Sequence, residues 1–387
     1  MRTHGLRLSA FTLMFALAGC TTAAGDAGTT VSVEPSVAPA STLPSGPAAA
    51  FPTAPFADIK EDPVSKEAAT TFQAALDDMA GRAGMTATVM TADGTWSGAT
   101  GKADGVRDVR VDDQFAIASI TKSLVAAQVM QLVEAGELGL DDPAANYLPP
   151  DFDFDTNGAT IRQLLGHHSG IPDYLPGVPL KPLNEDPRRL WKPAELLALV
   201  ADDRAPVGEA FEYANTNFHL LGLVIEQVRG RPIAEVLRDG VLSIDGVERL
   251  IYQPDEIPTE PMAMPFGRST KVLEEGGGFL PSLALSSVGP AGGMASDSTS
   301  LARWWRAFCA GEIASQASLT EMTTMHDGYG LGLYEPDPPG TVGHGGEHVG
   351  YVSMAGCLPE DGAVIVVLSN DVVDLSPVAQ RLIDAVD

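Results

Sequence analysis

Two short motifs in this chain of 387 residues combine side chains that can turn a hydroxyl group into a nucleophile. The first is Ser119-Ile-Thr-Lys122, and the second is Tyr213-Ala-Asn215. A serine hydroxyl reacts poorly until a neighbouring base takes its proton, which an amine or a phenolate can do. A helical pattern follows Ser119, and a spacing of three residues there places Lys122 beside the hydroxyl. The partial positive charge at the start of that helix would also favour an oxyanion, so the motifs predict covalent serine chemistry.

A third motif has the order His-x-x-Glu-His, at His344, Glu347 and His348. This pattern binds zinc when a helix carries both histidines on one face. Glycines crowd the same window, and each one inside a helix costs about 1 kcal/mol relative to alanine. The flanking residues are typical of a strand, on which the two histidines would lie about 13 Å apart. That separation is too large for one ion, so we expect a glycine-rich strand and no metal site.

The two ends of the chain carry strand and helix patterns that could frame these motifs. Residues 72–79 have helical spacing, and residues 85–101 predict a hairpin that turns at Asp93-Gly94. The helix after Ser119 has an apolar stripe that ends near Gly136. Further strands are predicted at 329–334, 348–356 and 363–370, and a last helix from Ser376.

The middle of the chain, roughly 125–290, is mostly helical in pattern, with proline-rich loops. We therefore expect an α/β (α+β) domain in which one antiparallel sheet is formed from both termini. Helices would flank this sheet, and a mainly helical subdomain would be inserted into it.

The first twenty residues predict a targeting segment. A short basic region precedes the apolar run 8–18, which is too short to span a bilayer. The segment ends in Leu-Ala-Gly-Cys20, which resembles the lipobox of bacterial lipoproteins, in which the cysteine carries the lipid. The alternative is an ordinary cleaved signal ahead of a free cysteine. We expect a membrane-anchored lipoprotein outside the cytoplasm, at the cell surface or in the periplasm.

Residues 21–62 are rich in proline, alanine and threonine and lack periodicity. This composition predicts a disordered linker between the anchor and a folded domain at 63–387. Cys309 and Cys357 are the remaining cysteines. They could pair in an oxidising compartment or stay as two buried thiols.

The formal net charge is −27, and no run is rich in lysine and arginine. Such a surface repels phosphate backbones, so nucleic acid is not an expected partner. An anionic substrate would need a few local cations. Arg268 could supply one, although an exposed arginine without a specific role is the simpler interpretation.

The three motifs, in this order, resemble the serine β-lactamase and penicillin-binding-protein superfamily. The nearest branch contains class C β-lactamases, serine DD-peptidases and related esterases. Besides Ser119-x-x-Lys122 and Tyr213-x-Asn215, the third motif corresponds to His344-Gly345-Gly346. Segments such as LLGHHSGIPDY at 164–174 agree, and the resemblance covers about residues 65–387.

The resemblance implies a role for each motif and no cofactor. Ser119 forms an acyl-enzyme, and Lys122 and Tyr213 exchange the proton, although which of them is the first base stays open. Asn215 positions the substrate amide. The backbone N–H groups of Ser119 and of Glu347, the latter on the strand of the third motif, form the oxyanion hole. Gly345 and Gly346 let the substrate backbone lie against that strand.

The third motif departs from the Lys-Thr-Gly that is typical of class C β-lactamases. His344 is expected to be largely neutral at pH 7, to hold a substrate carboxylate less firmly than lysine, and to give an acidic limb in the pH–rate profile. This favours a D-alanyl-D-alanine carboxypeptidase-like enzyme or a related amide or ester hydrolase. A true β-lactamase and a non-catalytic penicillin-binding or sensor protein are the alternatives. The expected partners are a small peptide, β-lactam or ester substrate, and possible cell wall precursors.

Outside the motifs, we expect His167, Trp304 and Trp305 to pack in the interior.

Overall fold

The computed structural model describes residues 50–78, 84–179, 186, 188–258, 260, 262–265, 282–336, 338–348 and 350–386. The predicted signal peptide with Cys20, residues 21–49 of the predicted linker, and Arg268 lie outside this part of the chain. Among the described residues, we find no helix with the length and apolar character needed to cross a membrane.

The fold begins earlier than the expected boundary at residue 63. Phe51 and Phe56 are buried, and Phe56 lies in the short helix α1 (Ala54–Ala57). The backbone N–H of Phe51 donates to Thr320 Oγ1 at 3.0 Å. Residues 50–62, which the composition assigned to the linker, therefore include part of the core.

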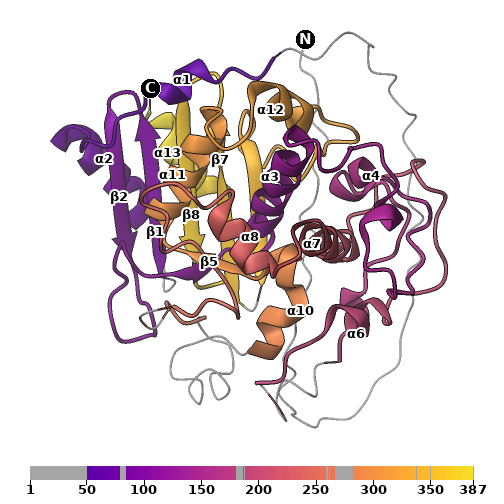
Figure 1. Cartoon of the computed structure of the whole chain (residues 1–387). Coiled ribbons are helices and arrows are strands. Elements are labelled where there is room, and N and C mark those ends of the chain that lie inside the picture. Colours follow the sequence, from indigo (N-terminus) through magenta and orange to yellow (C-terminus); the bar gives the residue numbers. More distant parts are fainter. Residues whose placement is uncertain are drawn as a thin grey trace, which may run out of the picture.

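A five-stranded antiparallel sheet is built from both ends of the chain, as the sequence predicts (Figure 1). Its order is β2-β1-β8-β7-β6. The strands are β1 (Met85–Thr91), β2 (Gly94–Thr100), β6 (Val342–His348), β7 (Tyr351–Leu358) and β8 (Ala363–Ser369). The predicted hairpin is present, with Thr91 paired to Gly94 and the glycine at a φ of 141°.

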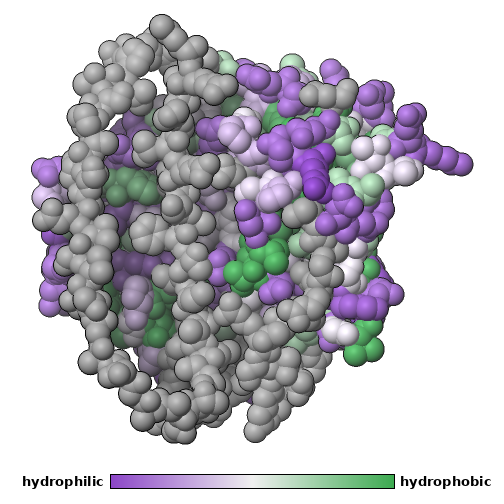
Figure 2. Space-filling view, turned by 180° about the vertical axis from the view of Figure 1, so that it is seen from behind, coloured by the Kyte–Doolittle hydropathy of each residue, from purple (hydrophilic) through white to green (hydrophobic). Residues whose placement is uncertain are grey.

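Helices cover both faces of this sheet. On one face, α2 (Lys66–Asp77) and α13 (Ser376–Asp384) enclose an apolar core that includes Phe72, Leu76 and Trp96. On the other face lies α11 (Ser298–Cys309), with Trp304 and Trp305 fully buried, which confirms that both are core residues. On the face drawn in Figure 2, the coloured residues are mostly hydrophilic, with small apolar patches among them.

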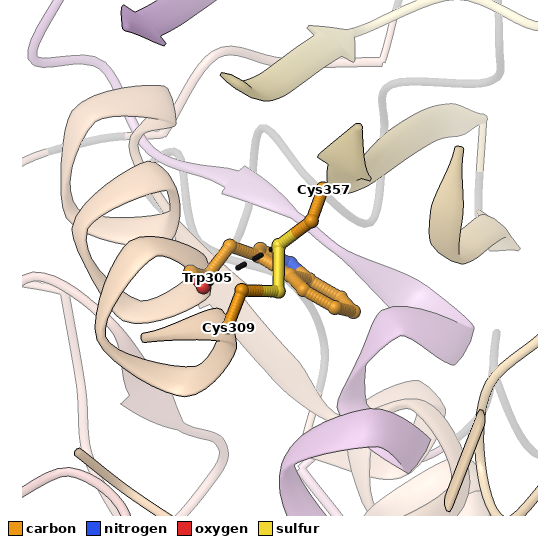
Figure 3. The surroundings of a disulfide bond; sticks show 3 residues. All are labelled: Trp305, Cys309 and Cys357. Atoms are coloured by element: carbon orange, nitrogen blue, oxygen red, sulfur yellow. Dashed lines mark hydrogen bonds between the residues drawn. A yellow bond between two sulfur atoms is a disulfide. The ribbon is translucent and has the colours of Figure 1, made fainter. Parts of the chain in front are cut away.

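A disulfide between Cys309 and Cys357 joins α11 to β7, which settles the question that the sequence left open. Both residues are fully buried, and Figure 3 shows the bond beside Trp305. The cross-link fixes the helix to the sheet on the face that is turned toward the helical part of the molecule.

The helical part contains the expected helices and a small sheet that was not expected. The helices are α3 (Thr121–Glu134), α4 (Ile161–Leu165), α6 (Pro193–Leu197), α7 (Asn215–Arg229), α8 (Ile233–Asp239), α10 (Ser282–Gly292) and α12 (Gln316–Thr323). The small sheet has the order β3-β5-β4, with β3 at Phe115–Ala116, β5 at Met294–Ser296 and β4 at Ile251–Tyr252.

The apolar stripe predicted for α3 is buried, and other elements surround the helix so that almost all of its residues are buried. One local prediction is wrong. The segment 329–334, predicted as a strand, forms only isolated bridges, such as the one between Tyr334 and Gly343. Its glycines allow a tight turn there, and Gly332 has a φ of 73°.

Candidate active site

Ser119 lies in the short turn η1 (Ala118–Ile120), between β3 and α3. The residue before it, Ala118, has a φ of 48°, a left-handed conformation that costs a residue with a side chain on the order of 1–3 kcal/mol. The hydroxyl of Ser353 on β7 donates to the Ile117 carbonyl at 2.7 Å and holds this segment against the main sheet. The serine is therefore presented on a constrained turn that leads directly into a buried helix.

Lys122 is fully buried, and its amino group touches three oxygen atoms. Nζ lies 2.8 Å from Asn215 Oδ1, 2.7 Å from the Ala291 carbonyl and 3.0 Å from Ser119 Oγ. The first two oxygens can only accept, whereas the serine hydroxyl can accept or donate. A neutral amine has two N–H groups for the two acceptors and a lone pair for the serine hydroxyl. The site thus satisfies both protonation states of Lys122.

Burial lowers the pKa of Lys122 to about 7, although the negative charge of Asp173 acts to raise it. Desolvation disfavours the ammonium form, and among the described residues no carboxylate hydrogen-bonds to the amine. A substantial fraction of the amine is therefore neutral near pH 7, with its lone pair available to take a proton.

Asp173 fixes the group that contacts Lys122. Its carboxylate accepts from the Asn215 side-chain Nδ2 at 3.0 Å and from the Asn215 backbone N–H at 3.1 Å. This pairing sets the orientation of the amide, so that Asn215 Oδ1 must face the lysine. Burial raises the pKa of Asp173, whereas the hydrogen bonds from Leu175 and Asn215 and the charge of Lys122 act against that effect.

Tyr213 lies beside the lysine, with its ring centre 4.8 Å from Nζ. Burial raises the pKa of the phenol well above its usual range, and a hydrogen bond with Ser119 opposes this only in part. His167 stacks on the ring at 4.3 Å and accepts from the Ala214 N–H through Nδ1 at 3.2 Å. His167 is fully buried, as predicted, and it packs against the tyrosine of the second motif.

His344 is on strand β6, so the helix that a zinc-binding His-x-x-Glu-His motif requires is not present. Both of its ring nitrogens are occupied: Nδ1 donates to the Gly345 carbonyl at 2.5 Å, and Nε2 accepts from the Tyr329 hydroxyl at 3.0 Å. Burial, together with the charge of Lys122, lowers the pKa of His344 to about 3.

Two expectations for His344 stay predictions: a contact with a substrate carboxylate and an acidic limb in the pH–rate profile. The lowered pKa disfavours an acidic limb from this ring near pH 7. Both ring nitrogens already have partners within the protein, which disfavours a substrate contact through them.

The glycines of the third motif allow β6 to lie directly against neighbouring groups. A Cβ atom at Gly346 would be 2.4 Å from the Ile117 carbonyl oxygen and 2.9 Å from Ala118 Cβ. At Gly345 it would be 2.7 Å from the Tyr334 hydroxyl. Strand β6, with Glu347 as the next residue, is therefore held against the turn that carries Ser119.

The structure brings together Ser119, Lys122, Tyr213 and Asn215, with the third motif beside them. Sequence reasoning missed Asp173 and the Ala291 carbonyl. Asp173 lies within the 164–174 segment that supported the resemblance, but nothing in its spacing shows that it meets Asn215.

Within the described ranges, no group of three or more histidine, cysteine, aspartate or glutamate residues could hold a metal ion.

Comparison with known proteins identifies a family model and several relatives. The family model described as Beta-lactamase matches residues 70–386. A putative penicillin-binding protein, PbpX, from Bacillus subtilis is 26% identical over 266 residues, which is 67% of this chain and 62% of that protein. The D-alanyl-D-alanine-carboxypeptidase/endopeptidase AmpH from Escherichia coli is 24% identical over 67% of this chain and 71% of its own length. A D-stereospecific amidohydrolase from Streptomyces sp. has a solved structure with a TM-score of 0.63 and 28% identity, covering 84% of this chain and 98% of that one.

Proposed function

This chain belongs to the beta-lactamase family of serine hydrolases, and on that premise we propose that it hydrolyses small amides or esters through an acyl-enzyme on Ser119. The observation that carries the proposal is the position of Lys122. A buried amine with a pKa of about 7 lies 3.0 Å from the serine oxygen, which is the geometry of a general base.

In the acylation step, the lone pair of neutral Lys122 takes the proton of Ser119 as Oγ bonds to the substrate carbonyl carbon. The backbone N–H groups of Ser119 and Glu347 stabilise the oxyanion. When the C–N or C–O bond breaks, the Tyr213 hydroxyl gives its proton to the leaving group and is reprotonated by the Lys122 ammonium. Water then attacks the ester of Ser119 by the reverse route, which releases the acid and restores the enzyme.

Lys122 is the better first base of the two candidates. Burial lowers the pKa of the lysine toward neutrality and raises the pKa of Tyr213, so at pH 7 the amine is available and the phenolate is not. Tyr213 is then suited to give a proton rather than to take one. Asn215 holds the lysine through Oδ1.

The third motif favours amides and esters over substrates that are held by a terminal carboxylate, because His344 is neutral and both of its nitrogens are occupied. The similarity to a D-stereospecific amidohydrolase and to a D-alanyl-D-alanine-carboxypeptidase supports small D-amino-acid amides and peptides as acyl donors.

Hydrolysis of three substrates by the purified protein tests this function. D-alanine p-nitroanilide should be turned over faster than either a D-alanyl-D-alanine peptide with a free carboxylate or benzylpenicillin, and Ser119→Ala should abolish the activity. Faster turnover of penicillin would make the protein a β-lactamase. Binding of penicillin without turnover of any of the three would favour a sensor.

We further propose that the enzyme works outside the cytoplasm, anchored by a lipid on Cys20. The lipobox-like sequence and the buried Cys309–Cys357 disulfide support this location, because disulfides persist in oxidising compartments. Cys20→Ala should move the protein from the membrane fraction to the soluble fraction, and an unchanged distribution would contradict the anchor.

A further inference from the structure

A pocket lies near the catalytic group, between α7, β4 and α10, with a volume of about 160 Å³. Its walls share two elements with the active site. Helix α7 starts at Asn215 and carries His219 and Glu226 into the pocket wall. Pro290, also in the wall, is followed by Ala291, whose carbonyl holds Lys122.

Two buried polar atoms of the described pocket wall have no hydrogen-bond partner: Trp191 Nε1 and Gln253 Oε1. Gln253 is 2% exposed. His219, also in the wall, is held by hydrogen bonds with the Ser287 and Val288 backbone. Buried polar groups are normally paired, so the free acceptor of Gln253 indicates a missing ligand.

The charge of the wall is negative. Glu226 and Asp255 both line the pocket, and the charge of Asp255 acts on Glu226. Burial is the main cause that raises the pKa of each carboxyl group. Neither forms an ion pair with a described residue, whereas their neighbour Glu256 is paired with Arg238 at 2.7 Å. None of the described residues that line the pocket is a lysine or an arginine.

The apolar and aromatic residues of the pocket wall favour a cation with an organic body. Leu223, Ile233 and Pro290 supply apolar walls, and Trp191 supplies an aromatic ring. The guanidinium of Arg189 stacks over this ring at 4.4 Å, so the ring already accepts a cation on one face. His219 contributes no positive charge, since burial lowers its pKa to about 3.

We propose that this pocket binds a small primary ammonium compound with an apolar body. The ammonium group would lie between Glu226 and Asp255 and donate to Gln253 Oε1, and the body would pack against Leu223 and Ile233. The site is separate from the acyl-donor site, and it does not depend on the chemistry of Ser119.

Isothermal titration calorimetry of the purified protein at pH 7.5 tests the proposal, with benzylamine as the probe and benzyl alcohol as its neutral counterpart. Benzylamine should bind saturably at one site, at least tenfold more tightly than the alcohol, because only the ammonium can pair with the carboxylates. Ser119→Ala should bind it equally well. No saturable binding, or equal binding of the alcohol, would overturn the proposal.

Variants of the wall locate the site. Glu226→Gln and Asp255→Asn should each weaken benzylamine binding at least fivefold. Glu235→Gln, on the exposed side of α8, is the matched control and should leave it unchanged. Glu226 also accepts from the Ile233 N–H at 3.0 Å, so Asp255→Asn decides the question if Glu226→Gln does not fold. Unchanged affinity in Asp255→Asn would contradict the site.

Discussion

The carboxylate of Asp173 accepts two hydrogen bonds from Asn215, at 3.0 Å and 3.1 Å, and thereby directs Asn215 Oδ1 toward Lys122. The amide of an unsupported asparagine could rotate and present its NH₂ group to the lysine. Asp173 is therefore a positioning residue: it acts on Lys122 through Asn215, and its negative charge also raises the pKa of the lysine.

Replacing Asp173 by asparagine should change both the rate and its pH dependence. Loss of the charge lowers the pKa of Lys122 further, so the acidic limb of kcat/KM should move to lower pH. Loss of the fixed amide should reduce kcat/KM at least tenfold. A pH–rate profile measures both effects. Asp327→Asn, which removes an exposed partner of His168, is the control and should have neither effect. An unshifted limb with full activity in Asp173→Asn would refute this role.

The wild-type profile should itself have an acidic limb near pH 7. The base must be neutral, so activity falls as pH drops through the Lys122 pKa of about 7. His344→Gln should leave the position of this limb unchanged, because the pKa of His344 lies near 3 and the ring is neutral across this range. The limb is read from kcat/KM between pH 5 and 9. If it moved with His344→Gln, the assignment of Lys122 as the base would be wrong.

Acid should destabilise the fold through four buried histidines: His167, His219, His344 and His348. Burial lowers the pKa of each, to about 3 for His219 and His344 and about 4 for His348. The unfolded chain, with histidine pKa values of about 6.5, therefore binds more protons below pH 6.5, and stability falls as pH falls. Each histidine contributes about 1.4 kcal/mol per pH unit in that window.

Urea unfolding between pH 7.5 and 5.5 measures this loss. His219→Phe should make the pH dependence shallower, whereas the exposed His326→Asn should not. Buried carboxyl groups with raised pKa values, such as Asp173 and Asp297, act in the opposite sense when they become protonated. A free energy of unfolding that stays constant over this range would contradict the neutral state of the four rings.

Reduction of the Cys309–Cys357 disulfide should lower the free energy of unfolding by about 2–4 kcal/mol. The bond closes a loop with a sequence separation of 48, and opening it gives the unfolded chain more conformational freedom. Unfolding with and without a reducing agent measures the effect. The double variant Cys309→Ala and Cys357→Ala should be less stable and should no longer respond to the reducing agent. Equal stability in both conditions would show that the bond adds nothing.

The main sheet was predictable because its strands and the Asp-Gly turn are local signals. The serine, lysine and tyrosine motifs were equally visible, since each combines two reactive or polar residues at a short spacing. The small sheet was missed because β3 and β4 have only two residues each and no alternation to detect. Phe51 and Phe56 were missed because a proline-rich composition surrounds two aromatic residues that become core only through distant contacts.

Asp173 and His344 show where sequence reasoning stops. Asp173 is 42 residues from Asn215, so only the folded chain reveals their pairing. His344 was expected to face a substrate carboxylate, but the structure buries it and pairs its Nε2 with the hydroxyl of Tyr329, 15 residues away. A residue type and its neighbours in the chain do not determine its protonation state, which depends on the surroundings that the fold creates.

The most direct test of the account is the intact mass of the protein, quenched in acid during the first turnover of an activated p-nitrophenyl ester. Wild-type protein should gain the mass of one acyl group, located on the peptide that contains Ser119, and Ser119→Ala should gain none. Lys122→Met should acylate at least a hundredfold more slowly. Release of p-nitrophenol without a gain of mass at Ser119, or an equal gain in Ser119→Ala, would contradict the central claim.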